Sequence, residues 1–319
     1  MNPIIKKSNK KAAFTIIELL TVMSIIVVLI SLLIPSLNMV RRYAKSVRQK
    51  AQLGSIGTAL ELFSAEHDGY PPSAWDDPTG VAYCGAMKLA EAMMGQDLLG
   101  FHPDSRFRSD GTDPALLPPD LDLYPRPAPA TPYPDWYIEN LQRRKGPYLQ
   151  PEYANVHKLK YLYGVDNTGA FPTGEEVVLC DVYLRVVLKP DPTDPPGLDI
   201  GRKSGMPILY YRANTSNNLH DVDAVDLPIV NDDKDNIYNF WDNHMLTALG
   251  LPWNLPPAGP DHPLFLVGAE PQGKRFYEIT WNRKITTAFR PCRSDSYILL
   301  SAGFDGEYGT DDDVFNFKK

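Results

Sequence analysis

An apolar run near the N-terminus constrains the fold of this chain more than any other feature. The run FTIIELLTVMSIIVVLISLLI extends over 21 residues from Phe14 to Ile34 and carries one charge, Glu18. A helix of that length is roughly 31 Å long at about 1.5 Å per residue, which matches the hydrocarbon core of a bilayer. The sequence therefore predicts one membrane-spanning helix.

Residues 1–13 form a basic leader before this run, with four lysines and no acidic residue. A secretory signal peptide would place its small-x-small cleavage site after the apolar stretch. Here the small pair Ala12-Ala13 comes before it. Cleavage at this pair would leave the hydrophobic helix attached to the mature protein.

Glu18 is unusual because a carboxylate inside a membrane segment costs about 2.5–3.5 kcal/mol on insertion scales. One interpretation places Glu18 near the membrane edge, where it reaches headgroups or water at little cost. The other pairs it with a positive group on a neighbouring copy, such as a free α-amino group at Phe14 after cleavage behind Ala13. The second interpretation would favour assembly over a lone helix in lipid.

The segment KKAAFTIIELLTVMSIIVVLISLLIP resembles the class III signal of type IV pilins and type II secretion pseudopilins. The shared features are a basic leader, a small residue, Phe, Thr, and Glu at the fifth mature position. The resemblance implies that a prepilin peptidase cuts between Ala13 and Phe14 and N-methylates Phe14. It also implies an assembly role for Glu18 and a helix-kinking role for Pro35. Ala13 stands where the family usually has Gly, and it is small enough for the same pocket.

The orientation in the membrane follows from the same resemblance. The leader lysines face five cations on the other side of the span, so the positive-inside rule does not choose between the two orientations. These five are Arg41, Arg42, Lys45, Arg48 and Lys50. By resemblance the leader is cytoplasmic, and the chain is a single-pass protein of the cytoplasmic (inner) membrane. Residues 36–319 then lie outside, in the periplasm.

After Pro35 the apolar pattern becomes amphipathic, with spacings of three and four that mark one helical stripe. The stripe consists of Leu37, Val40, Ala44, Val47, Ala51, Leu53, Ile56, Leu60 and Phe63. This pattern predicts a helix from Phe14 to Glu66, on the order of 80 Å long, that ends at His67-Asp68-Gly69. The segment Ala59 to Ser73 also resembles the helix end of the major pseudopilin, which favours the secretion branch over adhesive pili.

The predicted fold class is α+β, with the long helix packed on a C-terminal antiparallel sheet. The predicted divisions are a leader (1–13), a pilin helix (14–67, transmembrane over 14–35), and a periplasmic globular domain (68–319) whose residues 75–290 are an expansion. Loops dominate this domain, since the chain has 30 Pro and 22 Gly. Short helices are predicted over Ala86–Leu99 and Trp136–Arg144. Strands are predicted over Val177–Val187, Ile208–Arg212, Leu264–Val267 and Tyr297–Ser301.

The C-terminal segment SAGFDGEYGTDDDVFNF, within residues 297–317, combines clustered carboxylates with three glycines. Calcium takes six to eight oxygen ligands in irregular geometry, so such a loop suits it. The segment resembles the calcium loop of major pseudopilins. The resemblance implies the side chains of Asp305, Asp312 and Asp313 as ligands, with Leu300, Ser301 and Asp311 as further candidates. The alternative is an Asp-Gly turn with a solvated acidic tail.

Charge and cysteine content exclude other classes of function. Residues 1–50 carry nine cations and one acid, whereas the whole chain has a formal charge of −7. The rest of the chain is therefore acidic and lacks the basic face that nucleic acids require. Cys84, Cys180 and Cys292 allow at most one disulfide bridge. Asp104–Asp113 and Asn231–Asn236 are minor candidates for further cation loops.

No catalytic motif stands out among the histidines, serines or glycines, so we expect a structural subunit and not an enzyme. The expected function is that of a type II secretion pseudopilin. Its expected partners are a prepilin peptidase, other pseudopilin copies, the inner-membrane platform and the inner membrane. The alternative is a type IV pilus subunit or a surface-displayed binding module. Neighbouring genes for a secretin with secretion cargo, or for a retraction motor, would separate the two.

Overall fold

Helix α1 extends from Ile16 to Glu66 and joins the apolar run to the segment after Pro35. The computed structural model describes residues 15–113, 121–125, 133–171, 174–189, 202–217, 220, 236–253, 262–265 and 273–318. Ala13 and Phe14 lie outside these residues. The predicted end at Glu66 is confirmed: Asp68 adopts a left-handed φ of 53°, which stops the helix, and the Gly69 N–H donates back to the Ser64 carbonyl.

The chain divides into two compact units, Met1–Lys45 and Ser46–Lys319, and α1 contributes to both. In the first unit every described residue from Thr15 to Ala44 is exposed. Among the described residues, α1 is the one helix that is long and apolar enough to cross a membrane. An apolar surface this large needs a cover of lipid or protein.

In the second unit, the buried face of α1 begins only at Gln49 and continues through Leu53, Ile56, Leu60 and Phe63. The expectation that this whole stripe packs on the globular domain is wrong in its first half, since Leu37, Val40, Ala44, Val47 and Ala51 are exposed. The step from Ala51 to Leu53 is two residues, about 200° around the helix, so the two halves of the stripe lie on different faces. Apolar periodicity marks a face that can be buried, but it does not say what buries it. The buried face also includes Gln49 and Gln52, whose burial an apolar pattern does not predict.

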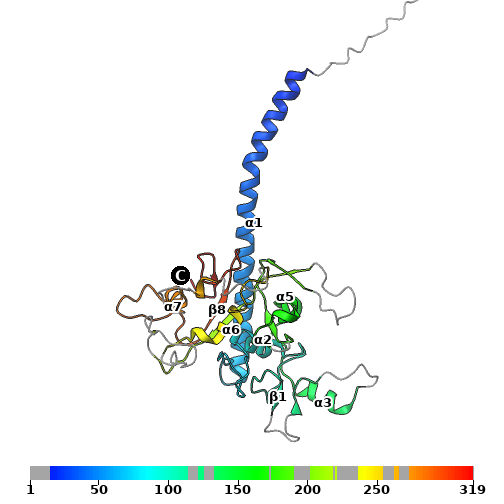
Figure 1. The fold of residues 1–319 in the computed structure, drawn as a ribbon, viewed down its shortest axis with the longest axis vertical. Helices are drawn as coiled ribbons and strands as arrows, with labels where there is room; N and C mark the ends of the chain where they lie inside the picture. Colours follow the sequence, from blue (N-terminus) through cyan, green and yellow to red (C-terminus); the bar gives the residue numbers. More distant parts are fainter. Residues whose placement is uncertain are drawn as a thin grey trace, which may run out of the picture. The chain divides into compact units, whose positions relative to one another are not determined.

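A three-stranded antiparallel sheet provides the centre of the second unit, with β8 (Tyr297–Ser301) between β7 (Leu209–Arg212) and β9 (Val314–Phe315). All five residues of β8 are buried. The Tyr297 hydroxyl reaches α1, lying 3.4 Å from both the Gly57 carbonyl oxygen and Glu61 Oε1. These contacts pack the second half of α1 on the sheet, so the predicted α+β class is confirmed (Figure 1).

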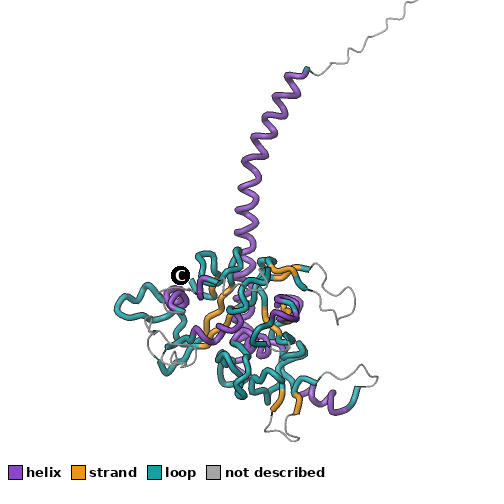
Figure 2. Tube along the Cα trace, in the orientation of Figure 1, coloured by secondary structure: helices purple, strands orange, loops and turns teal. Residues whose placement is uncertain are grey.

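Helix α2 (Gly85–Met94) packs against β7 and against β4 (Val177–Leu179), and every one of its residues is buried. The predicted helix Ala86–Leu99 ends early because Gly95 adopts a φ of 78°, where a Cβ would lie 2.2 Å from the Gly100 carbonyl oxygen. Loops join most of the remaining short elements (Figure 2). These elements are β1 (Thr112–Asp113), β2 (Leu121–Asp122), α3 (Asp135–Arg143), α4 (Pro151–Ala154), β3 (Val156–Lys158), α5 (Leu159–Tyr163), η1 (Val165–Asn167), β5 (Val186–Val187), β6 (Lys203–Ser204), η3 (Phe240–Asn243), α6 (His244–Thr247), η4 (Pro263–Phe265) and α7 (Lys274–Thr280).

Two strand predictions need correction. The predicted strand Val177–Val187 is two strands, β4 and β5, because the chain turns at Leu184, whose φ is 54°. The predicted strand Leu264–Val267 begins instead with the 3₁₀ helix η4, and its last two residues lie outside the described part. Pro263 fixes φ near the helical value and offers no N–H to a ladder, which disfavours a strand start there. The predicted strands at Ile208–Arg212 and Tyr297–Ser301 are confirmed, with the first starting at Leu209.

Candidate functional site

The first turn of α1 holds Glu18 in a reciprocal hydrogen-bonding arrangement with Thr15. The Thr15 backbone N–H and hydroxyl donate to Glu18 Oε2 at 2.9 and 2.7 Å, and the Glu18 N–H lies 3.3 Å from the Thr15 hydroxyl oxygen. This arrangement is a capping box, which satisfies backbone donors that the first turn leaves without helical partners. The Thr-x-x-Glu spacing is the sequence signal that predicts such a capping box. Glu18 is thus held in the first turn of α1 by Thr15, three residues before it.

Pro35 lies in the interior of α1, and the helix continues through it. A proline at this position removes one backbone hydrogen bond from the helix. The adjacent hydroxyls of Ser31 and Ser36 donate to their own helix, at the carbonyls of Val28 and Leu33. The serines therefore keep their hydroxyl groups satisfied on a surface that is otherwise apolar.

The C-terminal acidic loop brings together two of the predicted calcium ligands, Asp305 and Asp312. Their carboxyl groups lie close enough that each shifts the pKa of the other. The backbone N–H groups of Phe304 and Asp305 donate to Asp312 Oδ2 at 2.6 and 3.0 Å. Burial and the neighbouring carboxylate raise the pKa of Asp305. Burial also acts to raise the pKa of Asp312, but its hydrogen bonds, led by that of Thr310, lower it.

The other predicted ligands lie apart from this pair. Asp313 Oδ2 accepts the Gly309 N–H at 2.9 Å, and the fully exposed Asp311 carboxylate lies 3.7 Å from Arg275. The buried Ser301 hydroxyl donates to Asp181 Oδ2 at 2.9 Å. Leu300 lies in the ladder opposite Leu209 and Phe315.

Within the described residues, no group of three or more His, Cys, Asp or Glu is arranged to hold a metal ion. Among the predicted ligands, Asp305 and Asp312 are the two whose carboxyl groups lie close together. Gly303, Gly306 and Gly309 all have positive φ, so the loop takes a path that side chains at these positions would strain. Two neighbouring carboxyl groups repel when both are ionised, and a bound cation would relieve that repulsion.

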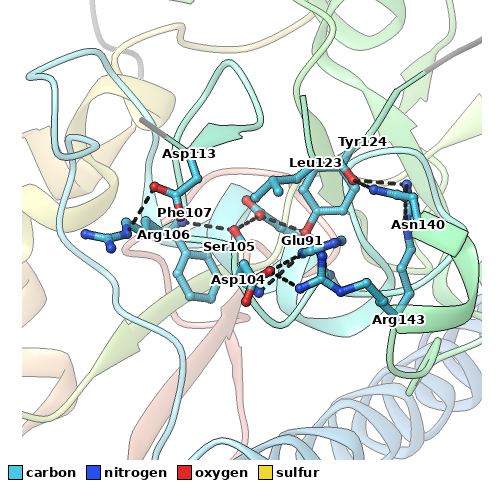
Figure 3. A network of polar contacts seen from close by, with 12 residues as sticks. Glu91, Asp104, Ser105, Arg106, Phe107, Asp113, Leu123, Tyr124, Asn140 and Arg143 are labelled. Carbon is cyan, nitrogen blue, oxygen red and sulfur yellow. Dashed lines mark hydrogen bonds and ion pairs between the residues drawn. The ribbon is translucent and has the colours of Figure 1, made fainter. Parts of the chain in front are cut away.

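Sequence reasoning missed a buried polar network around Glu91, a fully buried residue of α2 (Figure 3). Glu91 Oε1 accepts the hydroxyls of Ser105 and Tyr124 at 2.5 and 3.0 Å. Glu91 Oε2 accepts the Tyr83 hydroxyl at 2.6 Å and Gln96 Nε2 at 3.1 Å. All four donors are neutral. Burial raises the pKa of Glu91, and the hydrogen bonds oppose that rise.

Two surface pockets flank this network. Tyr83, Gln96 and Tyr124 line one of about 360 Å³, together with several carboxylates. Ser105 lines the other, of about 280 Å³, next to the rings of Phe63 and Phe101. Because its two carboxylate oxygens accept four hydrogen bonds, Glu91 anchors Tyr83, Gln96, Ser105 and Tyr124 to α2. A sequence signal existed, since Glu91 is the one acid in the otherwise apolar stretch LAEAMM.

The minor cation-loop candidate Asp104–Asp113 carries its own arginine partners. Three of its carboxylates lie close to guanidinium groups: Asp104 to Arg143 at 2.5 Å, Asp110 to Arg108 at 2.6 Å and Asp113 to Arg106 at 3.3 Å. These ion pairs neutralise the loop without a metal. The second candidate, Asn231–Asn236, lies outside the described residues except for Asn236. Cys84, Cys180 and Cys292 are all free thiols, so none forms the one bridge that the sequence allowed.

Comparisons with known proteins give no match, whether with family models, with curated proteins or with solved structures. The layout of a long apolar N-terminal helix followed by a small sheet is compatible with that of a pilin.

Proposed function

We propose that this chain is a structural pseudopilin subunit of a type II secretion system. In this proposal a prepilin peptidase removes residues 1–13, the helix from Phe14 to Pro35 anchors the subunit in the inner membrane, and the globular unit lies in the periplasm. Subunits then leave the membrane and assemble into a pseudopilus on an inner-membrane platform. Growth of the filament moves folded cargo outward.

One observation carries the proposal: the exposed apolar surface of α1 has a single carboxylate, held in the first turn by Thr15. A surface of this kind is stable in lipid or against other copies of itself. An acid there costs free energy unless a partner neutralises it. The α-amino group that cleavage would create at Phe14 of a neighbouring copy has the right charge, so Glu18 would set the register between subunits.

The test is the filament yield of variants at Glu18. Glu18→Ala should abolish filaments, and Glu18→Gln should do so as well, because it retains hydrogen-bonding capacity for the cap but removes the charge. In both variants the globular unit should unfold at the wild-type temperature. Ser31→Ala is the matched control, since Ser31 is another exposed polar residue of the same helix, and it should assemble normally. Wild-type filament yield from Glu18→Gln would refute the role of the charge.

The C-terminal loop supports a second part of the proposal, calcium binding by Asp305 and Asp312. Calcium would supply a positive charge between two neighbouring carboxyl groups, one of which raises the pKa of the other. A ligand that binds only the folded state, and is present at a free concentration of 100 times its Kd, adds about 2.7 kcal/mol to the free energy of unfolding. Adding a chelator should therefore lower the Tm of the full chain by a few degrees, and Asp312→Asn should remove that response.

The control for the calcium experiment is Asp166→Asn, because Asp166 is exposed and lies in η1, outside the C-terminal loop. This variant should respond to the chelator as the wild type does. If the wild-type Tm is the same with calcium and with chelator, the metal proposal is withdrawn, and the loop is a solvated Asp-Gly turn. The pseudopilin proposal does not depend on that outcome.

A further inference from the structure

The pocket of about 280 Å³ lies where α1 ends, and one wall of it is aromatic. Three almost fully buried phenylalanine rings form this wall. Phe101 is the middle one: its ring centroid lies 5.0 Å from that of Phe63, edge to face, and 5.5 Å from that of Phe107, in a stacked arrangement. His67 adds a fourth ring, 5.0 Å from Phe101. Because the rings pack on one another, the wall is formed before any ligand arrives.

The buried network of Glu91 fixes one side of this pocket. The Ser105 hydroxyl donates to Glu91 Oε1, and the Ser105 hydroxyl oxygen accepts the Phe107 N–H at 3.1 Å. Figure 3 shows Ser105 between Glu91 and Phe107. Phe107 has a φ of 55°, a left-handed conformation that is unfavourable for a bulky residue. The network therefore supports a backbone conformation that places an aromatic ring in the pocket wall.

Arg212 supplies the positive charge of the pocket. It is exposed at the end of β7, and a Cβ on Gly69 would lie 3.7 Å from Arg212 Nη2, so the guanidinium lies next to the turn that ends α1. Among the described residues, no carboxylate forms an ion pair with Arg212. Burial lowers the pKa of His67, so its imidazole is mostly neutral at pH 7. An available cation therefore lies beside an aromatic wall.

These features define the chemistry of the ligand. The guanidinium selects a carboxylate, and the rings select an apolar group. Asp68 is the other charged residue of the lining, and its carboxylate disfavours a ligand with a second negative charge. A volume of about 280 Å³ is small for a ligand site, since such sites hold roughly 300–1,000 Å³, so the ligand part that enters is about one large residue. Along a polypeptide, a carboxylate and an apolar side chain belong to one residue only at the C-terminus.

We propose that this pocket binds the C-terminal residue of a polypeptide whose last side chain is aromatic or branched aliphatic. The side chain packs against Phe63, Phe101 and Phe107, and Arg212 binds the α-carboxylate. Every residue of this site lies in the second unit of the chain, so the inference does not depend on the proposed function.

The experiment titrates the full-length chain in a neutral detergent against the fluorescein-labelled peptide Gly-Ser-Gly-Ser-Phe and follows fluorescence anisotropy. The same peptide with a C-terminal amide, and a version that ends in glycine, are the comparison probes. We expect the phenylalanine peptide with a free carboxylate to bind about tenfold more tightly than either, because each comparison probe loses one of the two contacts.

Variants of Arg212 test the carboxylate contact. R212Q should bind the acid and the amide alike, whereas R212K retains the charge and should retain part of the preference. R212Q should also unfold at the wild-type temperature, since the hydrogen bond from the backbone N–H of residue 212 to the Ser73 hydroxyl remains. R283Q is the matched control, because it removes another exposed cation of the second unit, and it should retain the preference of the wild type.

Equal binding of the acid and the amide by the wild type, or an unchanged preference in R212Q, would overturn the inference. So would equal binding of the phenylalanine and glycine peptides, because the rings would then take no part. Competition with 3-phenylpropionate distinguishes a polypeptide from a small aromatic acid. The unlabelled peptide should displace the probe at a lower concentration than 3-phenylpropionate does, and the reverse order would overturn the assignment to a polypeptide. None of these outcomes bears on the pseudopilin proposal, which rests on Glu18 and the apolar helix.

Discussion

Asp77 shows how one carboxylate can join two loops of the second unit. Its Oδ1 accepts the N–H and hydroxyl of Thr79 at 2.7 and 2.6 Å and the Val81 N–H at 3.1 Å. Its Oδ2 accepts the N–H and hydroxyl of Ser109, both at 3.0 Å. Burial acts to raise the pKa of Asp77, but the hydrogen bonds outweigh it and lower the pKa to about 2. The ionised form is therefore part of the folded structure.

We predict that Asp77→Asn lowers the free energy of unfolding by about 2 kcal/mol at pH 7. The pKa in the folded state lies below the unfolded value of 3.8, so the stabilisation is complete above pH 3.8 and is lost as the pH falls toward 2. Urea unfolding of the full chain in detergent, at pH 7 and at several values below 4, measures this. The difference between wild type and variant should shrink as the pH falls.

The exposed Asp166 provides the control for that comparison, since Asp166→Asn should change the free energy of unfolding by less than about 0.5 kcal/mol. A constant difference between wild type and Asp77→Asn from pH 7 down to pH 2 would contradict the role assigned to the Asp77 carboxylate.

Residues also differ in how far the sequence alone could predict them. Thr15 and Glu18 are three positions apart, so their contact follows from helix geometry and could be read from spacing. The partners of Glu91 include Ser105 and Tyr124, which are 14 and 33 residues away. No local sequence pattern predicts contacts between residues so far apart along the chain, because these contacts form only in the packed fold. For the same reason, the sequence does not predict the contact of Ser301 with Asp181, which lies 120 residues away.

Among the secondary-structure elements, α1 was the most predictable because its signals are local. Its apolar run, and its end at the Asp68-Gly69 turn, could be read directly. The face that α1 buries was harder to predict, since Gln49 and Gln52 are fully or nearly fully buried despite being polar. Gln49 Oε1 accepts the Val182 N–H at 2.9 Å. Polar groups that are buried where α1 packs on the rest of the second unit need hydrogen-bond partners, and here those partners come from loops distant in the sequence.

Gln52 provides a test of how α1 is held in the second unit. Its Nε2 donates to the carbonyls of Ala154 and Cys180 at 3.2 and 2.9 Å. Gln52→Met retains the length of the side chain but leaves both carbonyls without this donor, so we expect a loss of about 1–3 kcal/mol in the free energy of unfolding. Thermal and urea unfolding of the full chain measure it.

Ser55→Ala is the matched control for Gln52→Met, because the Ser55 hydroxyl is exposed and donates only to Ala51 of its own helix. This variant should differ little from the wild type. Equal stability of Gln52→Met and Ser55→Ala would show that the buried amide does not anchor the helix.

On the scale of the whole molecule, the order of a long helix followed by an antiparallel sheet could be predicted, because β7 and β8 are short apolar runs. The path of the middle of the chain could not be predicted from the sequence. Its strands are two to four residues long, and β4 pairs with β3 while β5 pairs with β6. Such short strands carry too few residues for a clear alternation of apolar and polar positions.

We propose that the apolar helix remains part of the mature protein and that the mature chain begins at Phe14, the residue that cleavage exposes. Mass spectrometry of the protein isolated from its native membrane tests this most directly. We expect a mature polypeptide that begins at N-methylated Phe14 and is recovered with the membrane or in filaments. A native chain that still begins at Met1, or a soluble monomer trimmed beyond Leu37, would contradict it.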